Sequence, residues 1–152
     1  MDVISSREIY DVIDYRRVDE SSIKQFMYQP LIDCLAEIYK DKNKAKQSLI
    51  WEASKQTTLH NIMMFGVQHR PDMEVKFKGI KIAIEVKKGE QGNDIRSGFG
   101  QCLMYQSYYD FTLYLFVDTS KDKRLLSSMT GEKEKKLMDS LWSNYNVMVN
   151  IV

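Results

Sequence analysis

Apolar residues recur along the chain with two different periods, and each period predicts a kind of element. Residues 22–40 follow the helical period of about 3.6 residues, which predicts an apolar helical stripe of Ile23, Phe26, Met27, Leu31, Cys34, Leu35 and Ile38. Pro30 lies within this segment, so a second helical piece could begin there. Residues 71–77 and 80–88 instead alternate apolar with polar positions, which predicts the two strands of a hairpin.

The remaining pattern alternates helical and extended segments. Helices are expected over residues 95–109 and 132–144, and strands over residues 111–118 and 147–152. The polar, basic residues 41–47 predict a link. Residues 48–69 are ambiguous, since their first part could end a helix or form a strand, while their second part favours a strand. This order predicts an α/β fold in a single domain over residues 1–152, with a mixed central β-sheet flanked by helices.

The register of the predicted hairpin follows from its turn. Lys78 and Gly79 are the expected two-residue turn, because glycine readily adopts a positive φ. Pairing outward from this turn sets Phe77 opposite Ile80, Val75 opposite Ile82, Met73 opposite Ile84 and Asp72 opposite Glu85. Directly opposed residues have Cβ atoms about 5 Å apart, where two carboxylates repel by roughly 3 kcal/mol at an effective dielectric constant of about 20. We therefore expect a positive charge between the two acids.

Two groups could supply that charge. Lys87 lies on the same strand face as Glu85, about 7 Å along the strand. The other candidate is a divalent ion that prefers oxygen ligands, and Mg²⁺ suits one or two carboxylates together with a carbonyl and waters. The pattern therefore predicts a metal site formed by Asp72 and Glu85, with a lysine beside it.

Composition restricts the class of protein further. The chain has 152 residues, of which 43% are hydrophobic and 28% charged, as is ordinary for a soluble globular domain. No apolar run is long enough to cross a bilayer, and the start MDVISSREIYD is not that of a signal peptide, so no membrane partner is expected. Cys34 and Cys102 fall in apolar helical segments and are expected to be reduced, which favours an intracellular, cytoplasmic location. The net charge of +1 argues against a non-specific nucleic-acid coat but allows a local basic groove.

A Pro-Asp pair at residues 71–72, followed by Glu-Val-Lys at residues 85–87, resembles the PD-(D/E)xK nuclease superfamily. This group includes restriction endonucleases, archaeal Holliday-junction resolvases and RecB-type exonuclease domains. In the next predicted helix Gln101 and Tyr105 stand four residues apart, which resembles the Gln-x-x-x-Tyr signature of RecB-type members. The resemblance covers about residues 30–118. It implies a restriction-endonuclease-like core and a metal-dependent phosphodiesterase.

The resemblance also implies a role for individual residues. Asp72 and Glu85 would hold Mg²⁺, with Mn²⁺ as an alternative, and the Val86 carbonyl would be a third ligand by analogy. Such an ion neutralises phosphate oxygens and lowers the pKa of a bound water. Lys87 would orient or deprotonate that water, or stabilise charge in the transition state. Gln101 would contact Lys87, the water or the phosphate.

Superfamily members often add a glutamate from the first helix as a further metal ligand. Glu37 and Glu52 are the two candidates in this chain. We prefer Glu37, because its segment is the more convincing helix and the surroundings of Glu52 could be a strand.

The expected function is a Mg²⁺-dependent nuclease, with DNA favoured over RNA as the substrate. The sequence does not decide between endonuclease and exonuclease action, or what specificity the enzyme has. A homodimer is considered, since a compact core that cuts both strands pairs two active sites. The alternative is a catalytically idle domain of the same fold that binds nucleic acid or protein. The intact set of Asp72, Glu85 and Lys87 favours the enzyme.

Overall fold

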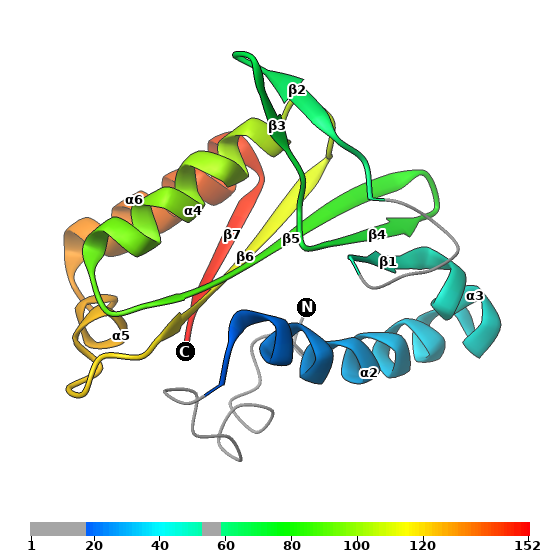
Figure 1. The fold of residues 1–152 in the computed structure, drawn as a ribbon, viewed down its shortest axis with the longest axis horizontal. Coiled ribbons are helices and arrows are strands. Elements are labelled where there is room, and N and C mark those ends of the chain that lie inside the picture. The colour runs from blue at the N-terminus through cyan, green and yellow to red at the C-terminus, as the bar shows by residue number, and fades with distance from the viewer. Residues whose placement is uncertain (1–17, 53–58) are drawn as a thin grey trace.

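A computed structural model describes residues 18–52 and 59–152, and Figure 1 shows their arrangement. The helices are α2 (Glu20–Tyr39), α3 (Lys42–Ser48), α4 (Gly92–Tyr105), α5 (Arg124–Ser128) and α6 (Glu132–Tyr145). The strands are β1 (Leu49–Trp51), β2 (Ile62–Met64), β3 (Val67–His69), β4 (Met73–Phe77), β5 (Ile80–Gly89), β6 (Phe111–Asp118) and β7 (Val147–Ile151). The interpretations of residues 1–11 and 53–56 lie outside the described residues.

The described residues form one mixed sheet of five strands in the order β1-β4-β5-β6-β7. Strands β1, β4 and β5 are antiparallel neighbours, whereas β5, β6 and β7 run parallel to one another. Each parallel connection passes through a helix, α4 between β5 and β6 and α6 between β6 and β7, as parallel strands require. The predicted α/β fold with a mixed sheet flanked by helices is confirmed.

Helices cover both faces of this sheet (Figure 1). Helices α2 and α3 lie on one face, and α4 and α6 lie on the other. Strand β5 therefore faces two environments, because successive side chains of a strand point to opposite sides. Ile84 and Val86 pack in the core formed with α2, while Ala83 packs against Tyr105 and Tyr109 on the side of α4. The second face of β5 is thus buried as well.

The β4–β5 hairpin follows the predicted register over most of its length. Lys78 and Gly79 have φ values of 48° and 86°, as a type I′ turn requires. The pairs from Phe77 with Ile80 to Met73 with Ile84 are present. The ladder ends there, so the predicted fourth pair, Asp72 with Glu85, is not formed. Beyond Met73 the Asp72 amide still donates to the Ile84 carbonyl, but the Asp72 carboxylate, and not a further strand residue, contacts the next part of β5.

Three local predictions differ from the structure. Helix α2 continues through Pro30, whose nitrogen cannot donate to the Phe26 carbonyl, and Phe26 is 49% exposed, so water can reach this turn of the helix. Residues 41–47, expected to be a link, contain most of α3, since Asp41 caps that helix by accepting from the amides of Asn43 and Lys44. Residues 62–69 form a separate hairpin, β2–β3. Within the described ranges no helix is both long and apolar enough for a membrane crossing.

Candidate metal and phosphodiester site

Asp72 lies one residue before β4, at the point where β5 loses its antiparallel neighbour. Its amide donates to the Ile84 carbonyl over 3.1 Å, and its Oδ2 accepts from the Val86 amide over 2.8 Å. The carboxylate thus replaces a strand partner for β5. Because the N–H and C=O of one strand residue point to the same side, the Val86 carbonyl is directed toward this edge too. Sequence spacing placed Asp72 and Val86 near each other, but did not reveal this contact.

Glu85 is the buried acid of the site, with 1% of its surface exposed. Its Oε1 lies 3.0 Å from Lys87 Nζ, and its Oε2 lies 2.8 Å from the Tyr105 hydroxyl. That hydroxyl is also 2.9 Å from the Arg70 carbonyl. Since a tyrosine hydroxyl carries one proton, it donates to one of these two oxygens at a time. Glu85, Lys87 and Tyr105 therefore form one connected polar group between β5 and α4.

Burial and charge shift the protonation of this group. Burial, together with the neighbouring Asp72 carboxylate, raises the pKa of Glu85 to about 7. Burial alone would lower the pKa of Lys87, but the adjacent Glu85 outweighs it and raises this pKa above its ordinary value. Burial and the Glu85 charge also raise the pKa of the Tyr105 hydroxyl, which stays protonated as a donor. A perturbed carboxyl beside a specific charged partner is typical of functional sites.

Lys24 is the residue that the sequence analysis missed. It comes from α2 on the opposite face of the sheet, and it is 6% exposed. Its Nζ lies 2.9 Å from Asp72 Oδ1 and 2.8 Å from Glu52 Oε1, and these two acids raise its pKa against the effect of burial. The sequence did contain a sign of this contact. Lys24 lies among the residues of the predicted apolar stripe, and a lysine that is buried there needs an anion as its partner.

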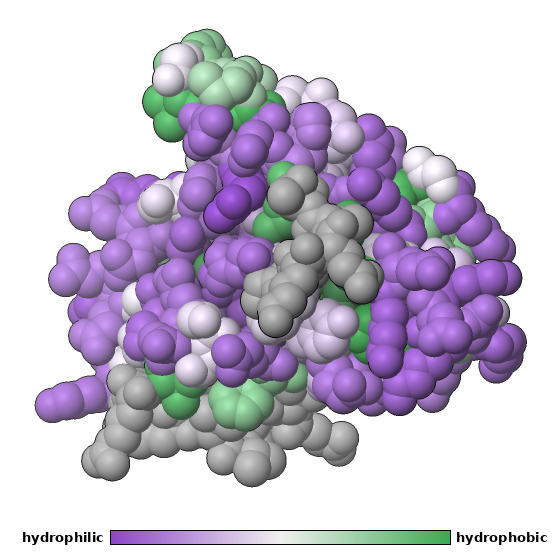
Figure 2. All heavy atoms as spheres, turned by 45° about the vertical axis from the view of Figure 1, so that its right-hand side comes forward, coloured by the Kyte–Doolittle hydropathy of each residue, from purple (hydrophilic) through white to green (hydrophobic). Residues whose placement is uncertain are grey.

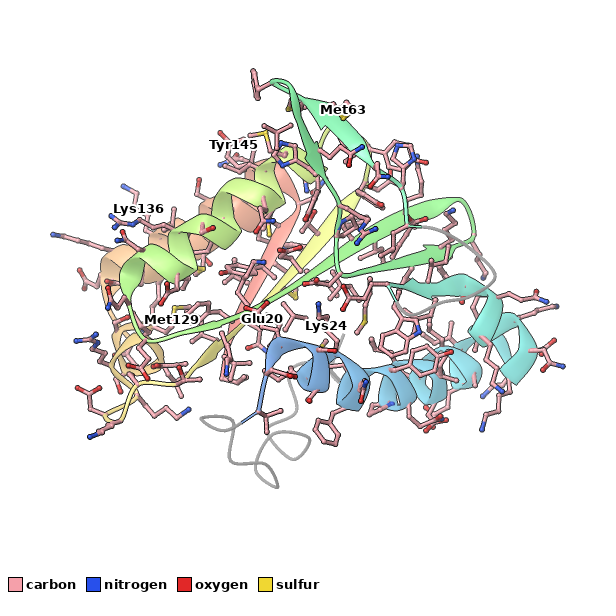
Figure 3. The ribbon with its side chains drawn as sticks, in the orientation of Figure 1. Glu20, Lys24, Met63, Met129, Lys136 and Tyr145 are labelled. Atoms are coloured by element: carbon pink, nitrogen blue, oxygen red, sulfur yellow. The ribbon has the colours of Figure 1, made fainter. Side chains whose placement is uncertain are left out.

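Glu20 lies one helical turn before Lys24, and Figure 3 shows both side chains at the start of α2 beneath the sheet. Glu20 Oε1 accepts from the Lys88 amide over 3.3 Å, and its charge contributes to the raised pKa of Lys87. The acid that the first helix carries toward the site is therefore Glu20. It was not among the predicted residues.

The choice of Glu37 over Glu52 is corrected by the structure. Glu37 is exposed and stands thirteen residues beyond Lys24 on the same helix, which is about 20 Å along its axis. It cannot share a metal with Asp72. Glu52 contacts Asp72 through Lys24. Gln101 is half-buried on α4, one turn before Tyr105, and its side chain makes no hydrogen bond with the described residues.

Two carboxylates and a carbonyl would suit a hydrated magnesium ion better than a cage made entirely of protein. Among residues 18–52 and 59–152 there is no group of three or more His, Cys, Asp or Glu side chains suited to a metal. Mg²⁺ needs only one or two carboxylates, because it keeps several waters. Each carboxylate oxygen also has a second lone pair besides the one used by a lysine.

The charge balance of the connected side chains favours an added cation. When ionised, Asp72, Glu85 and Glu52 carry −3, and Lys24 and Lys87 carry +2, so the network keeps −1. The contact between Lys24 and Asp72 shows that this position already accommodates a positive charge. Asp72, Glu85 and the Val86 carbonyl are thus the residues that could hold a divalent ion.

Comparisons with protein-family models, curated proteins and solved structures gave no match to this chain. The geometry of the site therefore carries the functional argument.

Proposed function

We propose that this protein is a divalent-metal-dependent nuclease that hydrolyses phosphodiester bonds in DNA. One observation carries the proposal. Asp72, Glu85 and Lys87 converge at the open edge of β5, where Lys87 is 3.0 Å from the buried Glu85 and Asp72 is bonded to the Val86 amide. The mixed sheet with helices on both faces agrees with the restriction-endonuclease-like core that the sequence motif implies.

The proposed chemistry assigns a task to each side chain. Asp72, Glu85 and the Val86 carbonyl would hold Mg²⁺ or Mn²⁺, which when bound supplies charge neutralisation at the phosphate and a water of lowered pKa. Lys87 stands next to the ligands as a protonated amine, and would stabilise charge that develops on the phosphate oxygens. Tyr105 fixes the orientation of Glu85. Gln101, on the same helix face as Tyr105, has a free amide with which to contact water or phosphate.

Lys24 gives this site a second ammonium group beside that of Lys87, and it contacts Asp72 directly. In the absence of metal its single positive charge is shared between Asp72 and Glu52. When an ion binds Asp72, Lys24 would turn toward Glu52 alone or toward the phosphate. The chain thus contains both the anionic ligands and two amines that can neutralise a bound polyanion.

The same lysine supports the second candidate function. With Asp72 neutralised by Lys24, the site is nearly charge-balanced without any metal, as a binding domain that has lost catalysis would be. In that case the protein would bind DNA and not cut it.

We further propose an intracellular, cytoplasmic setting and a homodimer when both strands of a duplex are cut. The setting is supported by Cys34 and Cys102, which are free thiols, Cys102 being buried. Sedimentation of the protein alone and with duplex DNA tests the dimer.

The decisive experiment measures cleavage by the purified protein. Supercoiled, linear and branched DNA and matched RNA are incubated with Mg²⁺, Mn²⁺ or EDTA. We expect cleavage of DNA that EDTA abolishes, and a loss of at least about 10²-fold in the Asp72→Asn protein, since Asp72 would hold the metal. Asp33→Asn is the matched control, because Asp33 is an exposed acid of α2 that pairs with Gln29 and lies away from the site.

The outcomes separate the two candidates. Cleavage that survives EDTA or Asp72→Asn contradicts the nuclease proposal. DNA binding without cleavage in any metal supports the idle binding domain instead.

A further inference from the structure

The β2–β3 hairpin, residues 62–69, projects from the body of the protein as an arm (Figure 1). Figure 2 shows apolar residues gathered at its end, and Met63 is labelled on it in Figure 3. Met63 is 63% exposed, Phe65 86% and Val67 56%. Three large apolar side chains at one exposed tip cost solvation free energy, which the arm does not recover by packing within the described residues.

The turn of this arm is also unfavourable for the fold. Phe65 and Gly66 have φ values of 52° and 74°, as the two central residues of a type I′ turn. Asparagine or glycine is preferred at the first of these positions, and a bulky aromatic residue is strained there. Phe65 therefore improves neither the turn nor the core. A ring kept at such a position points to a role in binding.

The tip is apolar on both of its faces. Met63 pairs with Gln68, and Met64 pairs with Val67, so Met63 and Val67 point to opposite sides of the two-stranded arm. A surface that docks against one protein partner needs only one apolar face. An aromatic ring at the end of such an arm can lie between neighbouring nucleic-acid bases, while the apolar side chains on its two faces contact the bases on either side.

The position of the arm ties it to the proposed catalytic site. Strand β3 leads through Arg70 and Pro71 directly to Asp72, so Phe65 precedes Asp72 by seven residues. An extended chain of that length spans at most about 23 Å, which corresponds to about seven stacked nucleotides of one strand. At the base of the arm, Ile62 packs in the same cluster as Tyr105, the residue that bonds Glu85.

The charge of the arm suits a polyanion. Residues 53–71 contain no aspartate or glutamate. Arg70 lies at the foot of the arm. Lys81 is also close to it, because its Nζ lies 3.7 Å from the ring centroid of Tyr108, which packs against the apolar cluster that contains Ile62. Phosphates could therefore approach the arm without meeting an acidic side chain of this segment.

We propose that the arm is a wedge that inserts Phe65 between bases at a branch or at a junction of double and single strands. Apolar side chains of this kind enter base steps in other DNA-binding proteins and unstack them. Branched DNA is the favoured substrate class, because bases at a branch cost less to unstack than bases within a duplex. The proposal rests on the proposed function in taking DNA as the substrate.

The test compares Phe65→Asn with wild type in EDTA, where a metal-dependent enzyme cannot cut. Fluorescence anisotropy measures binding to a three-way junction and to a linear duplex of equal length. Wild type should prefer the junction, and Phe65→Asn should bind the junction roughly tenfold more weakly or worse, as expected from the loss of one base–aromatic contact. Binding to the linear duplex should change less than about twofold. Phe65→Trp should keep the preference, because it restores an aromatic ring.

Stability distinguishes a binding role from a structural one. Asparagine suits the first position of a type I′ turn, so the melting temperature of Phe65→Asn should stay equal or rise. Lys78→Asn is the matched control, because Lys78 occupies the equivalent position of the β4–β5 turn with a φ of 48°. It should be equally stable and should weaken binding to both DNAs alike, through the loss of one charge.

Three outcomes decide the inference. Unchanged junction preference in Phe65→Asn overturns it. A shift of this variant from dimer to monomer, with DNA preference intact, also overturns it and makes a second copy of the chain the occupant of the tip. Loss of the junction preference in Phe65→Asn supports the wedge proposal. If in addition no metal permits cleavage, the nuclease proposal fails but the wedge proposal still holds.

Discussion

Replacing Lys24 with methionine should weaken the metal-free protein and enlarge its response to Mg²⁺. Lys24 Nζ lies 2.9 Å from Asp72 Oδ1 and 2.8 Å from Glu52 Oε1. Methionine keeps an unbranched apolar chain that can fill the same space, but it carries no charge. The two carboxylates would then face each other without the cation they share.

The size of the effect follows from the burial of the three groups. Removing one partner of a buried ion pair costs about 3–5 kcal/mol in the free energy of unfolding. The side chains of Asp72 and Glu52 are 15% and 35% exposed, so water compensates in part and we expect about 2–3 kcal/mol. For a domain of this length that loss lowers the melting temperature by about 4–12 °C in EDTA.

The response to metal should change in the opposite direction. Loss of the ammonium group takes the charge of the network from −1 to −2, and it frees Asp72 Oδ1 for an ion. Each tenfold gain in Mg²⁺ affinity adds about 1.4 kcal/mol of stabilisation when the metal is in excess. Thermal melting of both proteins in EDTA and in millimolar Mg²⁺ measures the difference.

A matched control separates this effect from the general loss of a lysine. Lys76 Nζ also contacts a buried carboxylate, Glu74 Oε1, at 2.8 Å, but Glu74 bonds Tyr109 and is not among the candidate ligands. Lys76→Met should gain no more from Mg²⁺ than wild type does. If Lys24→Met also gains no more than wild type, then Lys24 and a metal do not compete for Asp72, and the reasoning is refuted.

Two further predictions concern the β5 residues. Lys87→Ala should lose about 10²-fold or more in turnover, while DNA binding in Ca²⁺ changes little, because Lys87 would act in the transition state. Lys88→Ala, whose amine donates to the Val18 carbonyl instead, should keep near-normal turnover, and equal losses in both would indicate only a basic patch. Because the folded-state pKa of Glu85 is raised from 4.5 to about 7, the metal-free folded protein binds that proton more tightly than the unfolded chain. Stability should therefore fall by about 3 kcal/mol as the pH rises through this window, and urea titrations should show that Glu85→Gln removes the dependence.

Several features of the fold could be predicted from the sequence because they depend on short-range order. The alternation of apolar residues on either side of Lys78-Gly79 was enough to predict three of the hairpin pairs. Residues 111–118 were predicted to form a strand, and they form β6, which has a neighbouring strand on each side. The approach of Lys87 to Glu85 followed from their spacing of two residues along one strand.

Local contacts that override the pattern of apolar and polar residues could not be predicted from that pattern. The ladder was expected to continue to Asp72, yet the Asp72 carboxylate bonds the Val86 amide and ends it. The α3 helix was read as a link because its residues are polar, but its cap at Asp41 and the buried Ala45 stabilise it. In both cases an aspartate side chain that accepts hydrogen bonds from backbone amides helped to decide the backbone conformation.

The sequence by itself determined the mixed α/β fold class and the three residues Asp72, Glu85 and Lys87 of the candidate site. Asp72 directly precedes β4, and Glu85 and Lys87 lie on β5, which a two-residue turn joins to β4, so their proximity needs no information from elsewhere in the chain. Only the tertiary structure decided that α2 brings Lys24 to Asp72 from 48 residues away, and that Glu37 lies far from both. The position of a helix on a sheet depends on how the two surfaces pack, and the spacing of residues along the helix does not specify it.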